Sequence, residues 1–203
     1  MRVIAGEKGG RRLVPPPGLG TRPTADRVRE AAFSMLQSQL DLGGRFVWDL
    51  FAGSGAMGIE ALSRGAAHAI FVDAARPAVS AVKANLARLG YGPGRADVIC
   101  ADALKWVHGL DGPPPAPAVP GPGDPSPEDL IARLDLVLAD PPYTWQAWPA
   151  LLEGLSPRAP LVLMESSEAP ELPPPWEAVK VKRYGTTLLT LAWSPLPATV
   201  EAP

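Results

Sequence analysis

An acid, two prolines and a tyrosine follow an apolar run in the last third of the chain. Asp140, Pro141, Pro142 and Tyr143 come directly after the run at 134–139. An exocyclic amine of a nucleobase is a weak nucleophile, because its lone pair is delocalised into the ring. The carboxylate of Asp140 and the carbonyl oxygen of Pro141 can each accept one amine hydrogen, which favours a pyramidal nitrogen in the transition state. The turn therefore predicts a site that alkylates a flat amine.

Tyr143 completes this interpretation, because its ring could stack on the base and hold the nitrogen in line with an electrophilic carbon. Neither proline has a backbone N–H that would compete for the acceptors. A structural alternative stays open for the same residues. In that alternative Asp140 is a turn acid at the end of a strand, and Tyr143 packs at the rim.

A glycine-rich turn lies upstream. The apolar run at 46–51 predicts a buried strand, and a helical pattern follows at 59–64. Strand, glycine turn and helix is the order that brings a backbone close to a nucleotide, and Asp49 at the strand end can take a cationic or hydroxylated group. The expected cofactor-binding residues of this segment are Asp49, Phe51, Ala52, Gly53, Ser54 and Gly55.

Two further acids end predicted strands. Asp73 follows the run at 69–72 and suits the two hydroxyls of a ribose. Asp102 follows the strand pattern that begins at Val98, and its carboxylate could accept an adenine amino group. An equal alternative makes Asp102 the N-cap of a short helix at 104–109.

The identity of the cofactor depends on charge. Gly53, Gly55 and Gly58 match the spacing of a dinucleotide-binding loop. However, a carboxylate at Asp49 would repel a pyrophosphate, whereas it would attract a sulfonium or an amino group. The residues therefore favour S-adenosylmethionine.

Alternating strand and helix patterns predict an α/β fold with a mixed sheet. Helices are expected at 25–39, 77–89 and 145–155, with Val28, Phe33 and Leu36 as an inward stripe on the first, and later strands at 161–164, 179–183 and 188–193. Glu165 would end a strand on the same side as Asp140. We expect Asn85 to face solvent or cap locally, and the single cysteine, Cys100, to be a small core residue.

Composition predicts one core. The chain has 203 residues, 46% of them hydrophobic. We expect a basic extension at 1–40 and a catalytic domain at 41–197, with a solvated proline-rich loop at 111–129. No apolar stretch could span a bilayer, no signal peptide is expected, and no His or Cys pair has metal-ligand spacing, so the expectation is a cytoplasmic, metal-free monomer.

Positive charge is concentrated near the start. Residues 1–30 carry seven basic and three acidic side chains, a net charge of +4. Because the whole chain has a net charge of −2, the remaining residues carry a net charge of −6. Such a patch suits nucleic-acid phosphates, although a solvated hairpin with short strands at 2–4 and 12–14 is the alternative. The expected RNA-binding residues are Arg2, Lys8, Arg11, Arg12, Arg22, Arg27 and Arg29.

These segments resemble one known family. RPTADRVRE at 22–30, FAGSGAMGIEALSRGA at 51–66 and DPPY at 140–143 look like the RsmD family of bacterial methyltransferases, and the resemblance extends from 2–6 to 183–186. The resemblance implies a Rossmann-like, seven-stranded class I methyltransferase sheet. It also implies S-adenosylmethionine-dependent methylation of N2 of a guanine in 16S ribosomal RNA, within the assembling or assembled small subunit. The loop at 111–129 is longer and richer in proline than the family's usual connection.

Two other functions remain as alternatives. A DNA adenine or cytosine amino-methyltransferase uses the same Asp-Pro-Pro-Tyr chemistry, but it needs a target-recognition domain, and only some thirty residues of arm precede the predicted core. A non-catalytic RNA-binding assembly factor could keep the fold. Retention of Asp140, Tyr143 and the glycine turn favours an enzyme.

Overall fold

The apolar runs of the sequence become strands of one sheet in the computed structural model of the chain, which describes residues 1–16, 23–110 and 134–195, without the side chains of 23–25. Arg22 and the proline-rich loop at 111–129 lie outside the described residues. The seven strands are β1 Phe46–Leu50, β2 His68–Asp73, β3 Ala96–Cys100, β4 Leu136–Ala139, β5 Leu161–Ser166, β6 Glu177–Tyr184 and β7 Thr187–Trp193.

The strand order is β3-β2-β1-β4-β5-β7-β6. The first five strands in this order are parallel, and β7 pairs antiparallel with both β5 and β6. Short strands that are covered on both faces read as continuous apolar runs, which is why the sequence marks them so clearly. The order reverses between β1 and β4, and ligands of such sheets bind at the carboxyl ends of the strands beside that point.

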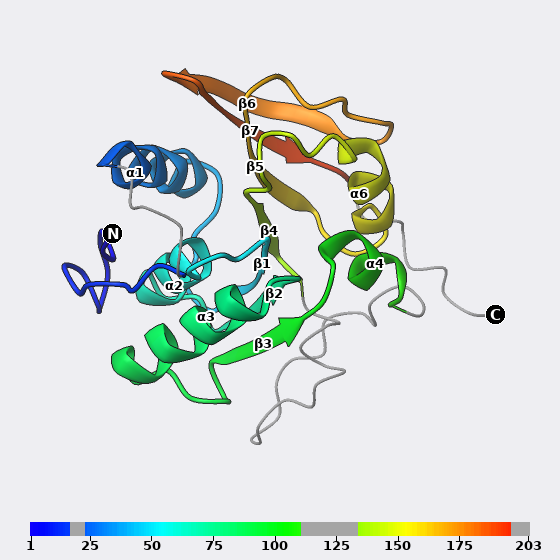
Figure 1. The fold of residues 1–203 in the computed structure, drawn as a ribbon. Helices are drawn as coiled ribbons and strands as arrows, with labels where there is room; N and C mark the ends of the chain where they lie inside the picture. Colours follow the sequence, from blue (N-terminus) through cyan, green and yellow to red (C-terminus); the bar gives the residue numbers. More distant parts are fainter. Residues whose placement is uncertain (17–22, 111–133, 196–203) are drawn as a thin grey trace.

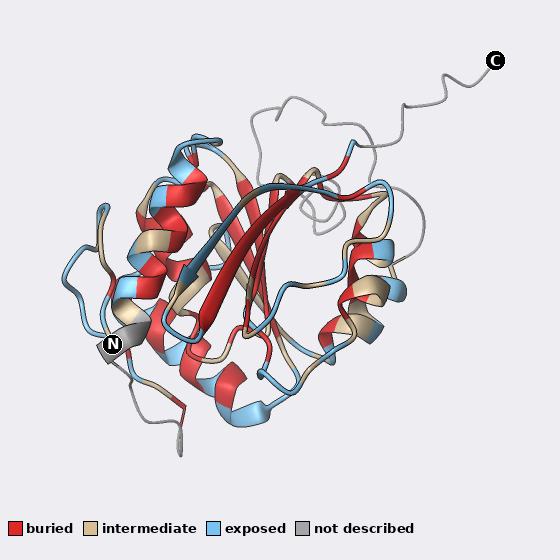
Figure 2. Ribbon diagram, turned by 90° about the horizontal axis from the view of Figure 1, so that it is seen from above, coloured by how far each residue is buried: buried red, intermediate tan, exposed pale blue. Residues whose placement is uncertain are grey.

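Helices cover both faces of the sheet (Figure 1). One face carries α1 Pro23–Gln37, α2 Ala56–Ser63 and α3 Arg76–Leu89; the other carries α4 Ala103–His108 and α6 Trp148–Leu155. Viewed from above, the buried strands run between these two helix layers (Figure 2). The predicted stripe of α1, Val28, Phe33 and Leu36, is buried as expected.

The N-terminal segment is fastened to the helices by buried polar side chains. Glu60, which is fully buried in α2, accepts the backbone N–H groups of Ile4 at 2.6 Å and Ala5 at 3.0 Å. Asn85 in α3 accepts the N–H of Val14 at 2.8 Å and donates to the carbonyls of Val14 and Ser54, each at 2.9 Å. The expectation that Asn85 faces solvent is wrong, because its side chain is 1% exposed.

Two other expectations need correction at the margins of the fold. The short strands of the hairpin alternative are reduced to an isolated antiparallel bridge between Arg2 and Arg12. Val3 and Leu13 still donate across the hairpin, whereas the N–H groups of Ile4 and Val14 bond to Glu60 and Asn85. Cys100 is exposed, since β3 is an outer strand of the sheet. Among the described residues, the helices are all too short or too polar to cross a bilayer.

Candidate active site

Four carboxylates gather where the central parallel strands end. Asp49 lies near the end of β1, Asp73 ends β2, Asp140 directly follows β4, and Glu165 lies near the end of β5. We call these four residues the acidic cluster. Ala139 pairs with Met164, so Asp140 lies beside Glu165 in register on the neighbouring strand. The sequence predicted the first three as site residues, and the direction of the strands brings all four to one edge of the sheet.

The glycine-rich loop is held by two of these acids. The Oδ2 atom of Asp49 accepts the N–H of Gly58 at 2.8 Å, and the Oδ2 atom of Asp73 accepts the N–H of Gly53 at 2.8 Å. A Cβ atom at Gly58 would lie 2.4 Å from the ring of Phe71, so only glycine fits there. At Gly53, by contrast, the nearest atom to such a Cβ would be 3.9 Å away, so a ligand could approach the backbone there.

Positive backbone φ angles shape the start of this loop. Phe51 has φ 63°, a left-handed value that is uncommon for a residue with a side chain, and Gly53 and Gly55 follow with φ 56° and 78°. The Phe51 ring packs against Trp145, with 5.0 Å between ring centroids. Strained residues of this kind cluster at functional sites. Through its contact with Trp145, Phe51 connects the glycine-rich loop to the segment that follows Tyr143.

The carboxyl group of Asp49 is buried among the strand ends, and this burial favours its neutral form. The side chain is 2% exposed, and burial is the main cause that raises its pKa from 3.8 to about 8. The bond from Gly58 lowers the pKa and the negative charge of Asp73 raises it. A buried carboxyl group of this kind gains from a cationic partner, which would restore its charge.

Asp140 has a raised pKa for related reasons. Asp140 is exposed as a residue, yet desolvation of its carboxylate at the strand ends is the largest cause. The negative charges of Glu165 and Asp49 raise its pKa further. The turn after it is closed by the N–H of Trp145, which donates to the carbonyl of Pro142 at 2.8 Å. Among the described residues no backbone N–H donates to the carbonyl of Pro141, which the sequence predicted as the acceptor beside Asp140.

Tyr143 is 37% exposed and is anchored through its hydroxyl, which lies 2.7 Å from Oγ1 of Thr187. Thr187 also hydrogen-bonds with Glu165. A threonine hydroxyl has one hydrogen. An ionised carboxylate can only accept, so when Glu165 is ionised Thr187 can donate to it and its oxygen can accept from Tyr143. The tyrosine ring is therefore tied to the acidic cluster, and its face stays available for stacking.

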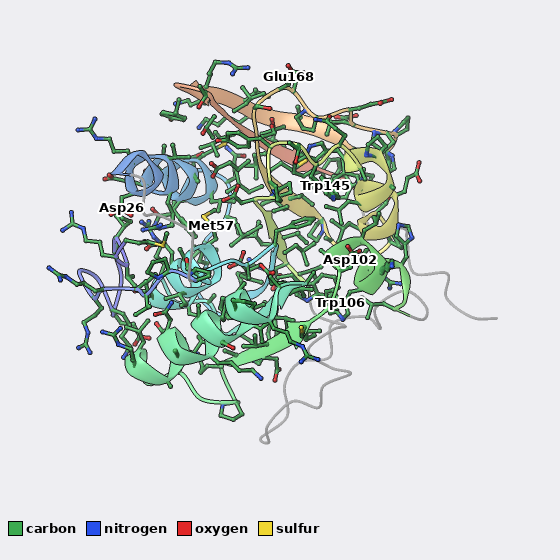
Figure 3. The ribbon with its side chains drawn as sticks, in the orientation of Figure 1. Asp26, Met57, Asp102, Trp106, Trp145 and Glu168 are labelled. Carbon is green, nitrogen blue, oxygen red and sulfur yellow. The ribbon has the colours of Figure 1, made fainter. Side chains whose placement is uncertain are left out.

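A pocket of about 200 Å³ opens beside this turn. Trp145 lies on the α6 side and Glu168 towards β6 (Figure 3). Trp145 and Trp148 pack edge to face, with 5.0 Å between ring centroids. The main side chains that line the pocket are Pro141, Tyr143, Trp145, Trp148, Glu165 and Glu168. Aromatic walls and acidic groups suit a flat ligand that carries hydrogen-bond donors.

The remaining predicted cofactor residues lie near the loop with different surroundings. Asp102 caps α4, since its Oδ1 atom accepts the N–H of Lys105 at 2.9 Å, which confirms the N-cap alternative and leaves its adenine contact a prediction. The Ser54 hydroxyl lies 3.0 Å from the sulfur of Met1. Ala52 and Ser54 are both buried, so they support the loop through packing.

The predicted RNA-binding residues divide into two groups. Arg2, Arg11, Arg12 and Arg27 are exposed, and Lys8 is partly buried against the ring of Tyr91. Arg29 does not lie on the surface: it is 4% exposed, and it donates to the carbonyl of Arg2 and to Asp26. We therefore remove Arg29 from the RNA-binding set, because a phosphate could not reach it in this arrangement.

Sequence reasoning missed several residues that organise the site. Thr187 carried no motif, and its link to Tyr143 spans 44 positions. Glu60 and Asn85 looked like ordinary helix residues, yet both are buried and hold the N-terminal segment. A charged or amide side chain within an otherwise apolar helix face was the signal that could have found them.

Comparisons with known proteins agree with this arrangement. The family model described as conserved hypothetical protein 95 matches residues 1–113, more than half of the chain. YlbH of Bacillus subtilis, named as an rRNA methyltransferase, is 55% identical over 108 residues, or 53% of this chain and 57% of that protein. The ribosomal RNA small subunit methyltransferase D of Haemophilus influenzae is 30% identical over 192 residues, or 91% of this chain and 89% of that protein.

The solved structure of the Escherichia coli protein yhhF, named as a methyltransferase, superposes with a TM-score of 0.76 at 29% identity. That match covers 97% of this chain and 99% of the E. coli chain. The chain spans little more than half the length of YlbH and of the ribosomal RNA small subunit methyltransferase D of Escherichia coli, at 57% and 52%. The mixed seven-stranded sheet, with helices on both faces, is the Rossmann-like methyltransferase fold. The chain belongs to the RsmD family.

Proposed function

We propose that this protein uses S-adenosylmethionine to methylate the exocyclic N2 amine of a guanine in 16S ribosomal RNA, within the assembling or assembled small subunit. The observation that carries the proposal is the position of Asp140 and the Pro141 carbonyl beside the glycine-rich loop and its acids. The names of the RsmD relatives support an rRNA substrate. The proposal keeps residues 1–40 as a basic extension and 41–197 as the catalytic domain.

The residues of the loop fit S-adenosylmethionine better than a dinucleotide. The acidic cluster would repel a pyrophosphate, whereas Asp49 can hold a positively charged amino or sulfonium group. Asp73 and the accessible backbone at Gly53 would bind the ribose hydroxyls. When bound, S-adenosylmethionine supplies an electrophilic methyl group. Phe51, Ala52, Ser54 and Gly55 would shape the loop around it, and Asp102 would lie beside the adenine.

The target amine would meet two acceptors. Asp140 and the Pro141 carbonyl each accept one N–H, which localises the lone pair on nitrogen as the new bond forms. Tyr143 stacks on the base and orients it. The methylated nitrogen carries a positive charge at first, and Asp140 or water can take its proton. Because Asp140 accepts strongly from the amine, and can take its proton, only as a carboxylate, turnover should rise with pH as this residue ionises.

The exposed arginines near the N-terminus would bind phosphates. Arg2, Arg11, Arg12 and Arg27 lie on the surface, and the acidic cluster lies at the strand ends. We infer that the RNA backbone follows the basic residues and that one base leaves the stack to reach Asp140, as enzymes that modify a base require. Lys8 and Arg22 stay predicted contacts of the same kind.

The test is methyl transfer from radiolabelled S-adenosylmethionine to small ribosomal subunits from cells that lack this activity. Naked 16S rRNA and DNA are assayed alongside, followed by nucleoside analysis. The expected product is N2-methylguanosine on the subunit. Asp140→Ala should lose at least about a hundredfold in kcat while it keeps RNA affinity, and the exposed Glu153→Gln serves as the matched control. Label on DNA alone would refute the RNA proposal.

A further inference from the structure

A second carboxylate lies beside the one that would activate the amine. Leu138 pairs with Leu163 across β4 and β5, and both pack on the α1 face of the sheet. Glu165 follows Leu163 by two positions on β5, so its side chain projects from that same face. Asp140 directly follows the end of β4, at the level of Glu165 on the neighbouring strand. Neighbouring strands are about 4.8 Å apart. The two carboxylates are close enough for the charge of Glu165 to raise the pKa of Asp140. Two adjacent acceptors of this kind can reach two donors on one side of a flat ring.

No ion pair within the described residues balances the charge of the half-buried Glu165 carboxylate. Among the ion pairs of the described residues, none includes Glu165. Arg29 exerts an attraction on it, but that guanidinium is already bound to the carbonyl of Arg2 and to Asp26. Thr187 supplies one hydrogen bond. A half-buried carboxylate that lines a pocket with one neutral donor still has acceptor capacity for a ligand.

The chemistry of the bases decides which ligand fits two adjacent acceptors. On the Watson–Crick edge of guanine, the N2 amine and the N1–H stand next to each other, and both are donors. In adenine and cytosine the exocyclic amine stands beside a ring nitrogen that is an acceptor. A second carboxylate would therefore attract guanine and repel the lone pair of the other two bases.

We propose that Glu165 selects guanine by accepting the N1–H of the target base, while Asp140 and the Pro141 carbonyl accept the hydrogens of its N2 amine. This inference rests on the proposed function and names the residue that sets its base specificity. Glu165 lines the pocket together with Tyr143 and Trp145. Thr187 links Tyr143 and Glu165, since its hydroxyl lies 2.7 Å from that of Tyr143 and hydrogen-bonds with Glu165.

The test removes the N1–H of the target base and keeps its exocyclic amine. Small subunits are reconstituted with 16S rRNA that carries either guanine or 2-aminopurine at the methylated position, introduced by ligation. In 2-aminopurine the amine is kept, but N1 is an acceptor. Wild-type protein should prefer guanine by about tenfold to a hundredfold in kcat/KM, the discrimination expected of a base contact.

Glu165→Gln reverses the relevant interaction at constant shape, because its amide N–H can donate to N1 of 2-aminopurine. The variant should lose at least about tenfold in kcat/KM on guanine, and its preference should fall to within about threefold of unity. The exposed Glu177→Gln, which removes the same charge on β6, should keep the wild-type preference. Binding of S-adenosylmethionine, measured by calorimetry, reports whether each variant is folded.

The outcomes separate the two proposals. If wild-type protein methylates guanine and Glu165→Gln keeps the full preference for it, the role of Glu165 is refuted and the proposed function stands. Equal use of both bases by the wild type refutes the same role. If the wild type transfers no methyl group to guanine, the proposed function fails and this inference with it. Should Glu165→Gln lose cofactor binding, Glu165→Asp replaces it; the shorter acid withdraws the acceptor, so an unchanged preference would refute the role.

Discussion

Replacement of Asp49 by asparagine should make the protein more stable at neutral pH while weakening the binding of its cofactor. Asp49 is 2% exposed, and burial raises its pKa from 3.8 to about 8. Asparagine has the shape of the protonated acid, and its oxygen can still accept the N–H of Gly58. The substitution therefore removes the cost of ionisation and leaves the packing in place.

The sign of the pH dependence follows from the two pKa values. Below pH 3.8 the folded and unfolded states both hold the proton, so Asp49 has no effect on the difference between them. Above pH 3.8 the unfolded chain releases the proton first, and stability falls until the folded state also ionises near pH 8. Within this window the loss is about 1.4 kcal/mol per pH unit. Between pH 5 and pH 7 the wild type should lose about 3 kcal/mol that Asp49→Asn retains.

Urea unfolding of both proteins at pH 5, 6 and 7 measures this difference directly. The pKa of Glu165 is also raised, and its contribution is common to both proteins. The charge of Asp49 helps to raise the pKa of Asp140, so its loss in Asp49→Asn adds to the difference in the same direction. Parallel stability curves for the two proteins would refute the assignment of a raised pKa to Asp49. Calorimetry with S-adenosylmethionine tests the predicted effect on cofactor binding. Wild-type affinity should rise as pH approaches 8, and Asp49→Asn should lack that rise.

Three further predictions concern the loop, the N-terminal segment and the basic surface. Asp73→Ala removes the acceptor that holds Gly53 and the proposed ribose contact, so affinity for S-adenosylmethionine should fall by about tenfold or more in calorimetry, and unchanged affinity would exclude the ribose role. Glu60→Ala leaves two backbone N–H groups without their buried acceptor and should lower the free energy of unfolding by about 3 kcal/mol in urea; a loss below about 1 kcal/mol would contradict the anchoring. Arg11→Ala and Arg12→Ala should each reduce the slope of log affinity for rRNA against log salt concentration by about 1, whereas an unchanged slope would place the phosphates elsewhere.

The fold could be predicted well because its strands are short, apolar and covered on both faces. The run at 46–51 became β1 Phe46–Leu50, and the pattern at 77–89 became α3 Arg76–Leu89. The order of the strands did not follow from these runs, since parallel pairing is set by crossover connections and not by local sequence. Cys100 shows the consequence: its apolar neighbours suggested a core strand, but β3 is an outer strand and the residue is exposed.

The candidate site could be predicted to the extent that its residues end strands. Asp49, Asp73 and Asp140 each stand at or near the end of an apolar run, and parallel strands bring their carboxyl ends together. Hydrogen bonds between distant segments could not be predicted in this way. Asn85 contacts Val14 across 71 positions, and Thr187 contacts Tyr143 across 44. Such pairs depend on the packing of whole elements, which a single sequence does not specify locally.

The distribution of charge gives the proposed RNA substrate one way to approach. Phosphates are attracted by exposed arginines such as Arg11 and Arg12 and repelled by the acidic cluster, so the backbone cannot enter the site where a base must bind. A base that carries hydrogen-bond donors has the opposite preference, because Asp140 and Glu165 are acceptors that its amine and ring N–H can satisfy. The same acids that make the site costly to fold at neutral pH thus separate base from phosphate. A substitution that neutralised one of them would be expected to gain stability and to lose this discrimination, which links the effect of Asp49→Asn on unfolding to that of Glu165→Gln on base preference.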